Sequence, residues 1–294
     1  MFSPSTLAGT KVAAIHDLSG FGRTSLTVVI PILSSMGIQV CPMPTAVLST
    51  HTTEFTNFSF CDLSTEMHKF LEHWRKLQLS FDAIYSGFLG SAKQMEIVED
   101  TIRYCKKENG LAIVDPVLGD NGKLDPTMTT EMVEKMRDLV SHADCITPNH
   151  SEACWLLNEP YSPYISIESI RERLVRLTEM GPSITVITSA PINNDTNTCS
   201  AVAYDAKQKR FWRVDCPYLP AFYPGTGDCF ASVLTGALLQ GDSLPVAMDR
   251  AVQFVTMGIR ATFGHDAPNC YGILLERVLN TLNSPSTASH YELL

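Results

Sequence analysis

The sequence predicts an α/β fold with a mainly parallel central sheet and helices on both of its faces. Between residues 11 and 190, short apolar runs alternate with longer stretches of helical periodicity. This alternation is typical of parallel strands joined by crossover helices. The chain has 294 residues, 45% of them hydrophobic, and is long enough to bury a large core.

The expected elements follow one another in a simple order. Strands are predicted at KVAAIH (11–16), IQVCP (38–42), FDAIYSG (81–87), LAIVDP (111–116), ADCITP (143–148) and SITVITSA (183–190), and helices at 92–107, 128–141 and 167–180. Residues 197–218 are predicted to form an antiparallel hairpin, and the pattern from 226 to 282 is helical. No repeat or linker divides the chain, so we expect a single domain over residues 1–294, with about 284–294 as a loose tail.

Charge and composition exclude several classes of protein. The net charge of −9 and the absence of a basic run disfavour nucleic acid and anionic membrane as partners. The N-terminal residues lack the features of a signal peptide, and no apolar run is long enough to span a membrane, so we expect a cytoplasmic protein. The nine cysteines include no C-x-x-C pair, which favours reduced, buried thiols over disulfides or a zinc site.

Polar residues follow the predicted strands, at the edge of the sheet where α/β proteins bind ligands. They are Asp115 in VDPVLGD, Asn149 and Glu152 in TPNHSEA, Ser189 after VIT, and the turn Gly225–Asp228. The segment Gly20-x-Gly22 resembles the start of a dinucleotide-binding fingerprint, but Ser25 occupies the third glycine position, and no P-loop motif occurs. These patterns argue against a nicotinamide, flavin or P-loop site.

The stretch YPGTGDCFAS (223–232) places an acid where an anion-binding loop is expected. Asp228 stands at or near the start of a helix whose free backbone N–H groups and dipole attract anions. One interpretation makes Asp228 an ordinary helix N-cap, worth about 1 kcal/mol. The other gives the carboxylate a chemical role beside a bound anion.

The ordered set DPVLGD, ITPNHSEA, VITSA and GTGD resembles the ribokinase-like superfamily and, within it, the pyridoxal/pyridoxamine kinases. The segments SGFLGSAKQ (86–94) and AVLSTHT (46–52) resemble the same kinases. The resemblance implies a ribokinase-like fold and transfer of the γ-phosphoryl of ATP to the 5′-hydroxyl of pyridoxal, pyridoxamine or pyridoxine. It makes Asp228 the general base, and the amides of Gly225, Thr226 and Gly227 an anion hole for the phosphoryl group. Base and anion hole must lie close together because the attacking oxygen is in line with the γ-phosphate.

The resemblance also implies nucleotide and metal contacts. It assigns Asn149 and Glu152 to water bound to Mg²⁺, Asp115 to the nucleotide and metal site, and Asp120 and Ser189 to the nucleotide, and it implies a monovalent cation such as K⁺ and a homodimer. Asp115 and Glu152 are the expected metal-site acids. The alternative for Asn149 and Glu152 is a helix capping box, and the alternative for DPVLGDNGK is a simple turn.

For the vitamin, the resemblance points to Asp17, Ser19, Thr52 and Phe88 as substrate contacts. Many pyridoxal kinases have a serine at the position of Asp17, and an aspartate there makes the chain resemble the hydroxymethylpyrimidine kinases. Asp228 argues the other way, because hydroxymethylpyrimidine kinases commonly have cysteine at that position. Two alternatives therefore remain open, a hydroxymethylpyrimidine kinase and a catalytically silent protein that binds B6 vitamers.

Overall fold

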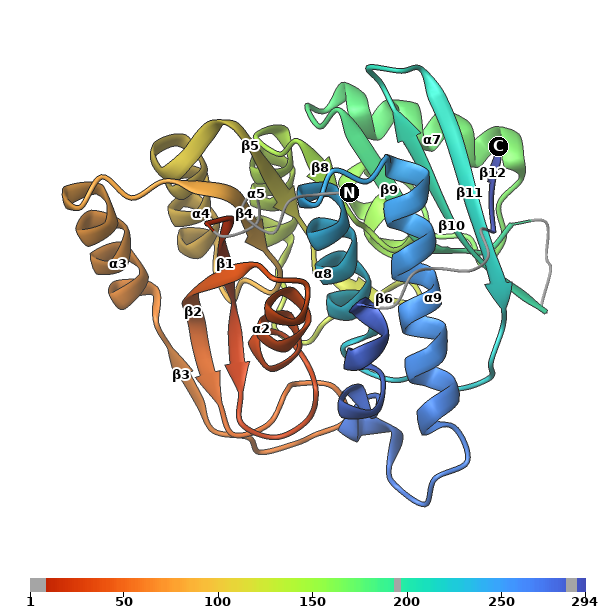
Figure 1. Ribbon diagram of the computed structural model, residues 1–294, viewed down its shortest axis with the longest axis horizontal. Coiled ribbons are helices and arrows are strands. Elements are labelled where there is room, and N and C mark those ends of the chain that lie inside the picture. Colours follow the sequence, from red (N-terminus) through yellow and green to blue (C-terminus); the bar gives the residue numbers. More distant parts are fainter. Residues whose placement is uncertain (1–8, 193–196, 284–289) are drawn as a thin grey trace.

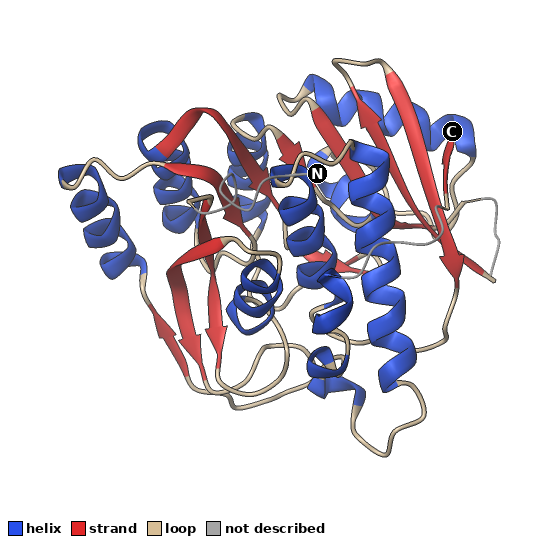
Figure 2. Cartoon of the chain, in the orientation of Figure 1, coloured by secondary structure: helices blue, strands red, loops and turns tan. Residues whose placement is uncertain are grey.

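The computed structural model describes residues 9–192, 197–283 and 290–294, and in these segments a ten-stranded sheet lies between two layers of helices (Figures 1 and 2). The strand order is β12-β11-β10-β9-β8-β5-β4-β1-β2-β3. The central strands are parallel: β2 (Gln39–Leu48), β1 (Lys11–Ser19), β4 (Phe81–Ser86), β5 (Lys106–Val114), β8 (Cys145–Ile146) and β9 (Ile184–Ala190).

Antiparallel strands extend the sheet at both edges. β3 (Phe60–Asp62) pairs with β2, and β10 (Thr198–Asp205), β11 (Arg210–Pro217) and β12 (Tyr291–Leu293) continue from β9. A separate small hairpin consists of β6 (Gly119–Asp120) and β7 (Lys123–Leu124). The predicted parallel core and the predicted hairpin at 197–218 are both confirmed.

Each face of the sheet has its own hydrophobic core. One face is covered by α3 (Ser64–Lys76), α4 (Ala92–Cys105), α5 (Thr130–Ser141), α6 (His150–Leu156) and α7 (Ile167–Glu179). The other is covered by α2 (Leu26–Ser35), α8 (Thr226–Leu239) and α9 (Leu244–Thr262), with short 3₁₀ turns at Asn269–Tyr271, Leu275–Arg277 and Leu279–Asn283. Helices α2, α8 and α9 lie in front of the sheet in Figure 1.

The helices of the two layers differ in sequence because they differ in burial. Helix α7 carries a single apolar stripe, with Ile170, Leu174 and Leu177 buried and charged residues on the outer face. In α8, nine residues from Cys229 to Ala237 are buried, since this helix packs between the sheet, α2 and α9. Among the described residues, no helix combines the length and the apolar character needed to cross a bilayer.

The expectation of a loose tail is wrong for its last residues. Tyr291–Leu293 form β12, which pairs antiparallel with Trp212–Val214 of β11, and the ring of Tyr291 makes an edge contact with Trp212. The outer edge of β11 offers unpaired backbone groups that a short segment can satisfy, and a short polar stretch gives no sign of this in sequence. Residues 284–289 of the predicted tail lie outside the described residues.

The carboxyl ends of the six parallel strands meet at one edge of the sheet. The segments that leave this edge begin at residues 20, 49, 87, 115, 147 and 191. They carry, or adjoin, most of the polar residues that the sequence singled out, and α8 begins at the same edge. A binding site is expected here in an open α/β sheet.

Candidate active site

The start of α8 is a turn that only glycine can form without strain. Gly225 is the N-cap residue with φ 81°, and a Cβ at this position would lie 2.0 Å from the carbonyl oxygen of Arg23. The first intrahelical bond joins the N–H of Cys229 to the carbonyl of Gly225 at 2.9 Å, so the amides of Thr226, Gly227 and Asp228 precede it. These amides and the helix dipole form a site suited to an anion.

Asp228 lies in the first turn of α8 and is nearly buried, with 13% of its side chain exposed. Its Oδ2 accepts a hydrogen bond from the backbone N–H of Ser25 at 2.9 Å. Burial raises the pKa of Asp228 from 3.8 to about 7, the Ser25 N–H opposes this, and the charges of Asp115 and Asp17 add to it. A carboxyl group with a pKa near neutrality is well matched to accept a proton from an alcohol.

Ser25 joins the first strand to the start of α8. Its N–H holds Asp228, and its hydroxyl donates to Oδ1 of Asp17. Ser25 adopts φ 52°, a conformation that non-glycine residues rarely take, which indicates that tertiary contacts hold it there. The sequence analysis did not predict Ser25 as a site residue. The available signal was its position in the incomplete dinucleotide fingerprint.

Asp17 and Ser19 form part of this network and do not point freely at a ligand. Ser19 donates its hydroxyl to Oδ2 of Asp17 at 2.9 Å, so each oxygen of Asp17 accepts a serine hydroxyl. Asp17 is only 4% exposed, and burial raises its pKa against the opposing effect of the two serines. The geometry therefore favours a role for Asp17 in holding Ser25 and, through it, Asp228.

His16 is a second residue that the sequence did not reveal. It is fully buried, its Nδ1 lies 4.0 Å from Oδ1 of Asp228, and neither ring nitrogen has a hydrogen-bond partner among the described residues. Burial lowers the pKa of His16 to about 3, with a weaker opposing effect of the Tyr85 backbone, so the imidazole is neutral. Gly87 leaves room for the ring, because a Cβ there would lie 2.3 Å from Nδ1.

Two further acids lie behind the anion site. Asp115 follows β5, is buried, and accepts a hydrogen bond from the Thr147 hydroxyl at 3.0 Å. An added Cβ on Gly227 would lie 4.0 Å from Oδ2 of Asp115, so the start of α8 faces this carboxyl. Burial raises the pKa of Asp115 to about 7, and burial together with the charge of Asp115 raises the pKa of Glu152.

Asn149 and Glu152 form the capping box that was the alternative interpretation. The side chain of Asn149 accepts from the N–H of Glu152 at 2.9 Å, and Oε2 of Glu152 accepts from the N–H of Asn149 at 2.7 Å. The other carboxylate oxygen of Glu152 accepts from the N–H of Leu118 at 3.1 Å. The two residues therefore fix the loop that follows Asp115 as well as the start of α6.

The outer nucleotide candidates lie at the rim of the same edge. Asp120 is exposed in the β6–β7 hairpin, where it accepts from the N–H of Asn121 at 2.7 Å, as the turn interpretation predicts. Ser189 is the next-to-last residue of β9 and has φ 52°, and the thiol of Cys199 lies 3.9 Å from its hydroxyl. The structure thus places Asp115 beside the start of α8, with Asn149 and Glu152 next to Asp115, and leaves Asp120 in β6 and Ser189 near the end of β9.

The expected vitamin contacts are divided between the surface and the core. Thr52 is half-buried and donates its hydroxyl to Asp125 at 3.2 Å, whereas Phe88 is 8% exposed and packs in the hydrophobic core beneath α3 and α4. A group of aromatic rings lies at this end of the site. Phe21, which is 47% exposed, contacts Tyr271 and Phe55 edge to face, with ring centroids 4.8 and 6.1 Å away.

The segment after α9 closes over this end and is fastened to the first loop. The Nε–H of Arg23 is shared between both carboxylate oxygens of Glu276, each at 3.0 Å, and another N–H of the guanidinium donates to the carbonyl of Tyr271. His51, which is buried, contacts the carbonyl of Cys270 at 2.7 Å. Residues 270–276 therefore complete the region that contains the aromatic rings.

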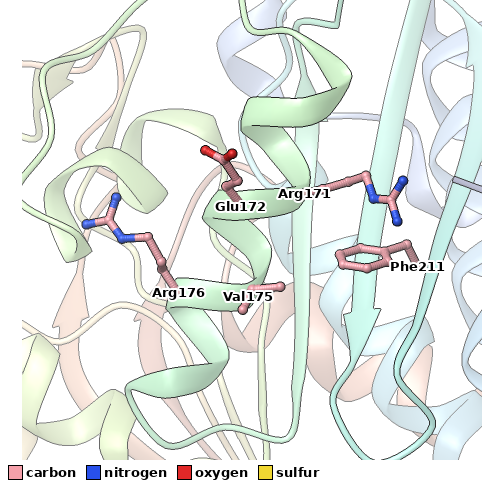
Figure 3. Close-up of a pocket in the computed structure, with 5 residues that line it drawn as sticks. All are labelled: Arg171, Glu172, Val175, Arg176 and Phe211. Atoms are coloured by element: carbon pink, nitrogen blue, oxygen red, sulfur yellow. The ribbon is translucent and has the colours of Figure 1, made fainter.

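A surface pocket elsewhere is formed by α7 and β11. Arg171, Glu172, Val175, Arg176 and Phe211 line it, and the guanidinium of Arg171 lies 4.5 Å from the centre of the Phe211 ring (Figure 3). Phe211 is opposite Tyr204, which is opposite Thr185 near the start of β9. The pocket therefore lies away from the strand ends and from Asp228.

The acids at the strand ends fit a hydrated cation better than a cage of protein ligands. Among the described residues, no group of three or more His, Cys, Asp or Glu side chains is arranged to hold a metal ion directly. Burial raises the pKa values of Asp115 and Glu152, and a nearby positive charge would stabilise their ionised forms. Mg²⁺ commonly keeps several waters and uses few carboxylates, so this donor set is compatible with it.

Comparison with known proteins identifies the fold and the family. Residues 30–269 match the family model described as phosphomethylpyrimidine kinase. A provisionally named phosphomethylpyrimidine kinase from Bacteroides thetaiotaomicron, solved with pyridoxal, is 54% identical over 97% of this chain and 99% of its own, with a TM-score of 0.94. Pyridoxal kinase from Lactobacillus plantarum is 30% identical over 93% of this chain and 96% of its own, with a TM-score of 0.84.

More distant relatives share the fold. Pyridoxal kinase from Leishmania donovani, solved with ADP, is 22% identical over 97% of this chain and 99% of its own, with a TM-score of 0.88. Among curated proteins, a pyridoxal kinase PdxY of Corynebacterium diphtheriae is 29% identical, and the match covers 63% of this chain and 65% of the relative. The chain thus matches a little under two thirds of the length of that relative. The predicted ribokinase-like fold is confirmed.

Proposed function

The chain belongs to the pyridoxal kinase family of ribokinase-like proteins, and on this premise we propose that it transfers the γ-phosphoryl group of ATP to the 5′-hydroxyl of pyridoxal, pyridoxamine or pyridoxine. One observation carries the proposal. A nearly buried carboxyl, Asp228, whose pKa is raised to about 7, lies in the first turn of a helix that offers free amides to an anion. Phosphoryl transfer to an alcohol needs a base and an anion site within a few ångströms of each other.

In the proposed mechanism Asp228 accepts the proton of the substrate hydroxyl as that oxygen attacks phosphorus. The N–H of Ser25 fixes one oxygen of Asp228, so the other is free to face the alcohol. The amides of Thr226 and Gly227, with the Gly225 turn, stabilise the negative charge of the phosphoryl group. His16, held neutral, contributes a dipole beside the base.

The proposed donor is ATP, which is supported by the structure of the Leishmania donovani relative with ADP. Asp115 and Glu152 are proposed to hold Mg²⁺ through water, with Asn149 fixing the loop that carries Glu152 and with Asp120 and Ser189 beside the nucleotide. When bound, the ion supplies charge neutralisation at the phosphates. A K⁺ ion, a homodimer, a single domain and a cytoplasmic location stay predictions.

The proposed vitamin site lies between Thr52 and the aromatic rings of Phe21, Phe55 and Tyr271. Flat rings at right angles to one another offer faces and edges to a heterocycle. The pyridoxal found with the Bacteroides thetaiotaomicron relative supports a B6 vitamer as the substrate. Phe88 is proposed to support this region from the core.

A second candidate is a hydroxymethylpyrimidine kinase, favoured by the description of the family model and by Asp17. A carboxylate at position 17 could pair with an aminopyrimidine, but both of its oxygens already accept serine hydroxyls. If the pyrimidine is used at all, Asp17→Ser should weaken that reaction more than the B6 reaction.

The test is a coupled assay of ADP release with the three B6 vitamers, hydroxymethylpyrimidine and ribose as acceptors. The expected result is the highest kcat/KM for a B6 vitamer, because polar groups left unpaired by the wrong ring cost binding energy. A kcat/KM for hydroxymethylpyrimidine equal to or above that of every vitamer would overturn the substrate assignment. No ADP release with any acceptor would point to a silent vitamer-binding protein.

A further inference from the structure

Cys199 and Cys216 lie opposite each other on two antiparallel strands, β10 and β11. The thiol of Cys216 points back across the ladder, with its Sγ 3.5 Å from the carbonyl oxygen of Cys199. Residues directly opposite in an antiparallel pair have Cβ atoms about 4.5–5.5 Å apart, and a disulfide needs about 3.5–4.5 Å. A small approach of the two strands is therefore enough to join the sulfurs.

The two thiols are free and accessible. All nine cysteines lie in the described segments and are unpaired, but only Cys105, Cys145, Cys154 and Cys229 are buried. Cys199 and Cys216 are half-buried, so the expectation of buried thiols is wrong for them. They lie on strands next to one edge of the sheet, and β12 covers β11 only at Trp212–Val214, so it does not pair with Cys216.

Their surroundings make the two sulfurs unequal. The hydrogen bond from the Cys199 thiol lowers the pKa of Cys216 to about 7, and a hydrogen bond with Thr256 and the charge of Arg260 act in the same direction. Burial and the charge of Asp215 oppose them. The same thiol contact raises the pKa of Cys199. Cys216 is therefore the more acidic of the two thiols, and the thiolate is the reactive form.

We propose that Cys199 and Cys216 are a redox modification site, at which hydrogen peroxide forms a reversible disulfide between β10 and β11. The Cys216 thiolate attacks one peroxide oxygen, the O–O bond breaks, and a sulfenic acid and hydroxide result. The Cys199 thiol then loses its proton and attacks the sulfenic sulfur, and water leaves as the S–S bond forms. Two thiols and one peroxide give one disulfide and two waters, with two electrons passing from sulfur to oxygen; a dithiol reverses the reaction.

The position of the pair couples it to the nucleotide end of the site. The Cys199 thiol contacts the hydroxyl of Ser189, the residue in a strained conformation at the end of β9. Closure of the disulfide ends this contact and draws Cys199 toward β11. Resting on the proposed function, the expected consequence is weaker binding of ATP, by about fivefold for one lost hydrogen bond, with little change for the vitamin.

The test is peptide mass mapping of the full chain after treatment with one equivalent of hydrogen peroxide, combined with the KM values for ATP and pyridoxal. The expected result is a cross-linked pair of peptides that contain Cys199 and Cys216 and lack two hydrogens, and a raised KM for ATP that a dithiol restores. Cys61→Ser, which removes an exposed thiol on β3 at the opposite edge of the sheet, should behave like the unchanged chain. Cys216→Ser should give neither the cross-link nor the shift in KM.

The two parts of the proposal fail separately. Oxidation of other thiols without a Cys199–Cys216 cross-link would overturn the modification site. A complete cross-link with an unchanged KM for ATP would overturn its effect on the nucleotide. If the reduced protein releases no ADP with any acceptor, the proposed function fails, and the mass measurement still decides the modification site.

Discussion

Replacing Asp228 with asparagine should stabilise the protein above neutral pH while nearly abolishing turnover. Burial raises the pKa of Asp228 from 3.8 to about 7. When the pKa of a carboxyl group is higher in the folded state, its contribution to stability is fully present below the unfolded-state pKa. That contribution is lost as the pH rises through the folded-state pKa. The difference between 3.8 and about 7 corresponds to a cost of at most about 4 kcal/mol at pH 8. Asparagine removes this cost and can still accept the N–H of Ser25.

The measurement is urea unfolding of both proteins at pH 4 and pH 8 without nucleotide or metal, together with kcat. The asparagine variant should be more stable by up to about 4 kcal/mol at pH 8 and by much less at pH 4, and its kcat should fall at least ~10²-fold, because a general base commonly supplies that much. Near-normal turnover would show that Asp228 is not the general base and only holds the backbone of Ser25. Equal stability of the two proteins at pH 8 would refute the argument that burial destabilises the ionised form of Asp228.

Three further changes test the surroundings of this base. Glu152→Gln should shift the Mg²⁺ titration of activity to higher concentration; an unchanged titration with a lower melting temperature would leave the residue a helix cap alone. Gly225→Ala should lower stability by about 1–3 kcal/mol and kcat by at least ~10²-fold, because the added Cβ has no room. The control Gly264→Ala has a similar φ in open space, so it should cost only the backbone strain and leave kcat unchanged. Equal effects of the two changes on thermal unfolding and turnover would contradict this reasoning. His16→Leu should move the low-pH limb of the kcat/KM profile to higher pH, because it removes a dipole beside Asp228. A uniform loss of kcat/KM at all pH values would show that His16 only fills space in the core.

Much of the fold could be predicted because buried segments have a recognisable apolar pattern in the local sequence. The strands at 11–16, 81–87 and 183–190 are short apolar runs, and the structure places β1, β4 and β9 there. β12 escaped notice because three exposed residues acquire their conformation only by pairing with β11, a contact between distant parts of the chain. Helix α2 was also missed, since it is apolar on all sides, contains Pro31, and shows no periodic stripe.

The site was predicted where a motif lies at a strand end or helix start. The turn before Asp228 and the pair Asn149 and Glu152 belong to that class. Ser25 and His16 do not, because their significance comes from contacts with Asp228, more than 200 residues along the chain, and no local pattern encodes such a contact. Asp17 was assigned to the substrate from the family resemblance, and the sequence does not reveal the two serine hydroxyls that its carboxylate accepts.

The fastening of residues 270–276 to Arg23 and His51 has a consequence for synthesis of the protein on the ribosome. The first loop and the six parallel strands, which end at residue 190, emerge before Tyr271 and Glu276, which hold Arg23. Domains generally fold as units during synthesis, so the contacts that close this end of the site must wait for residues 270–276. A nascent chain therefore completes this end of the proposed vitamin site only after residue 276 has emerged from the ribosome.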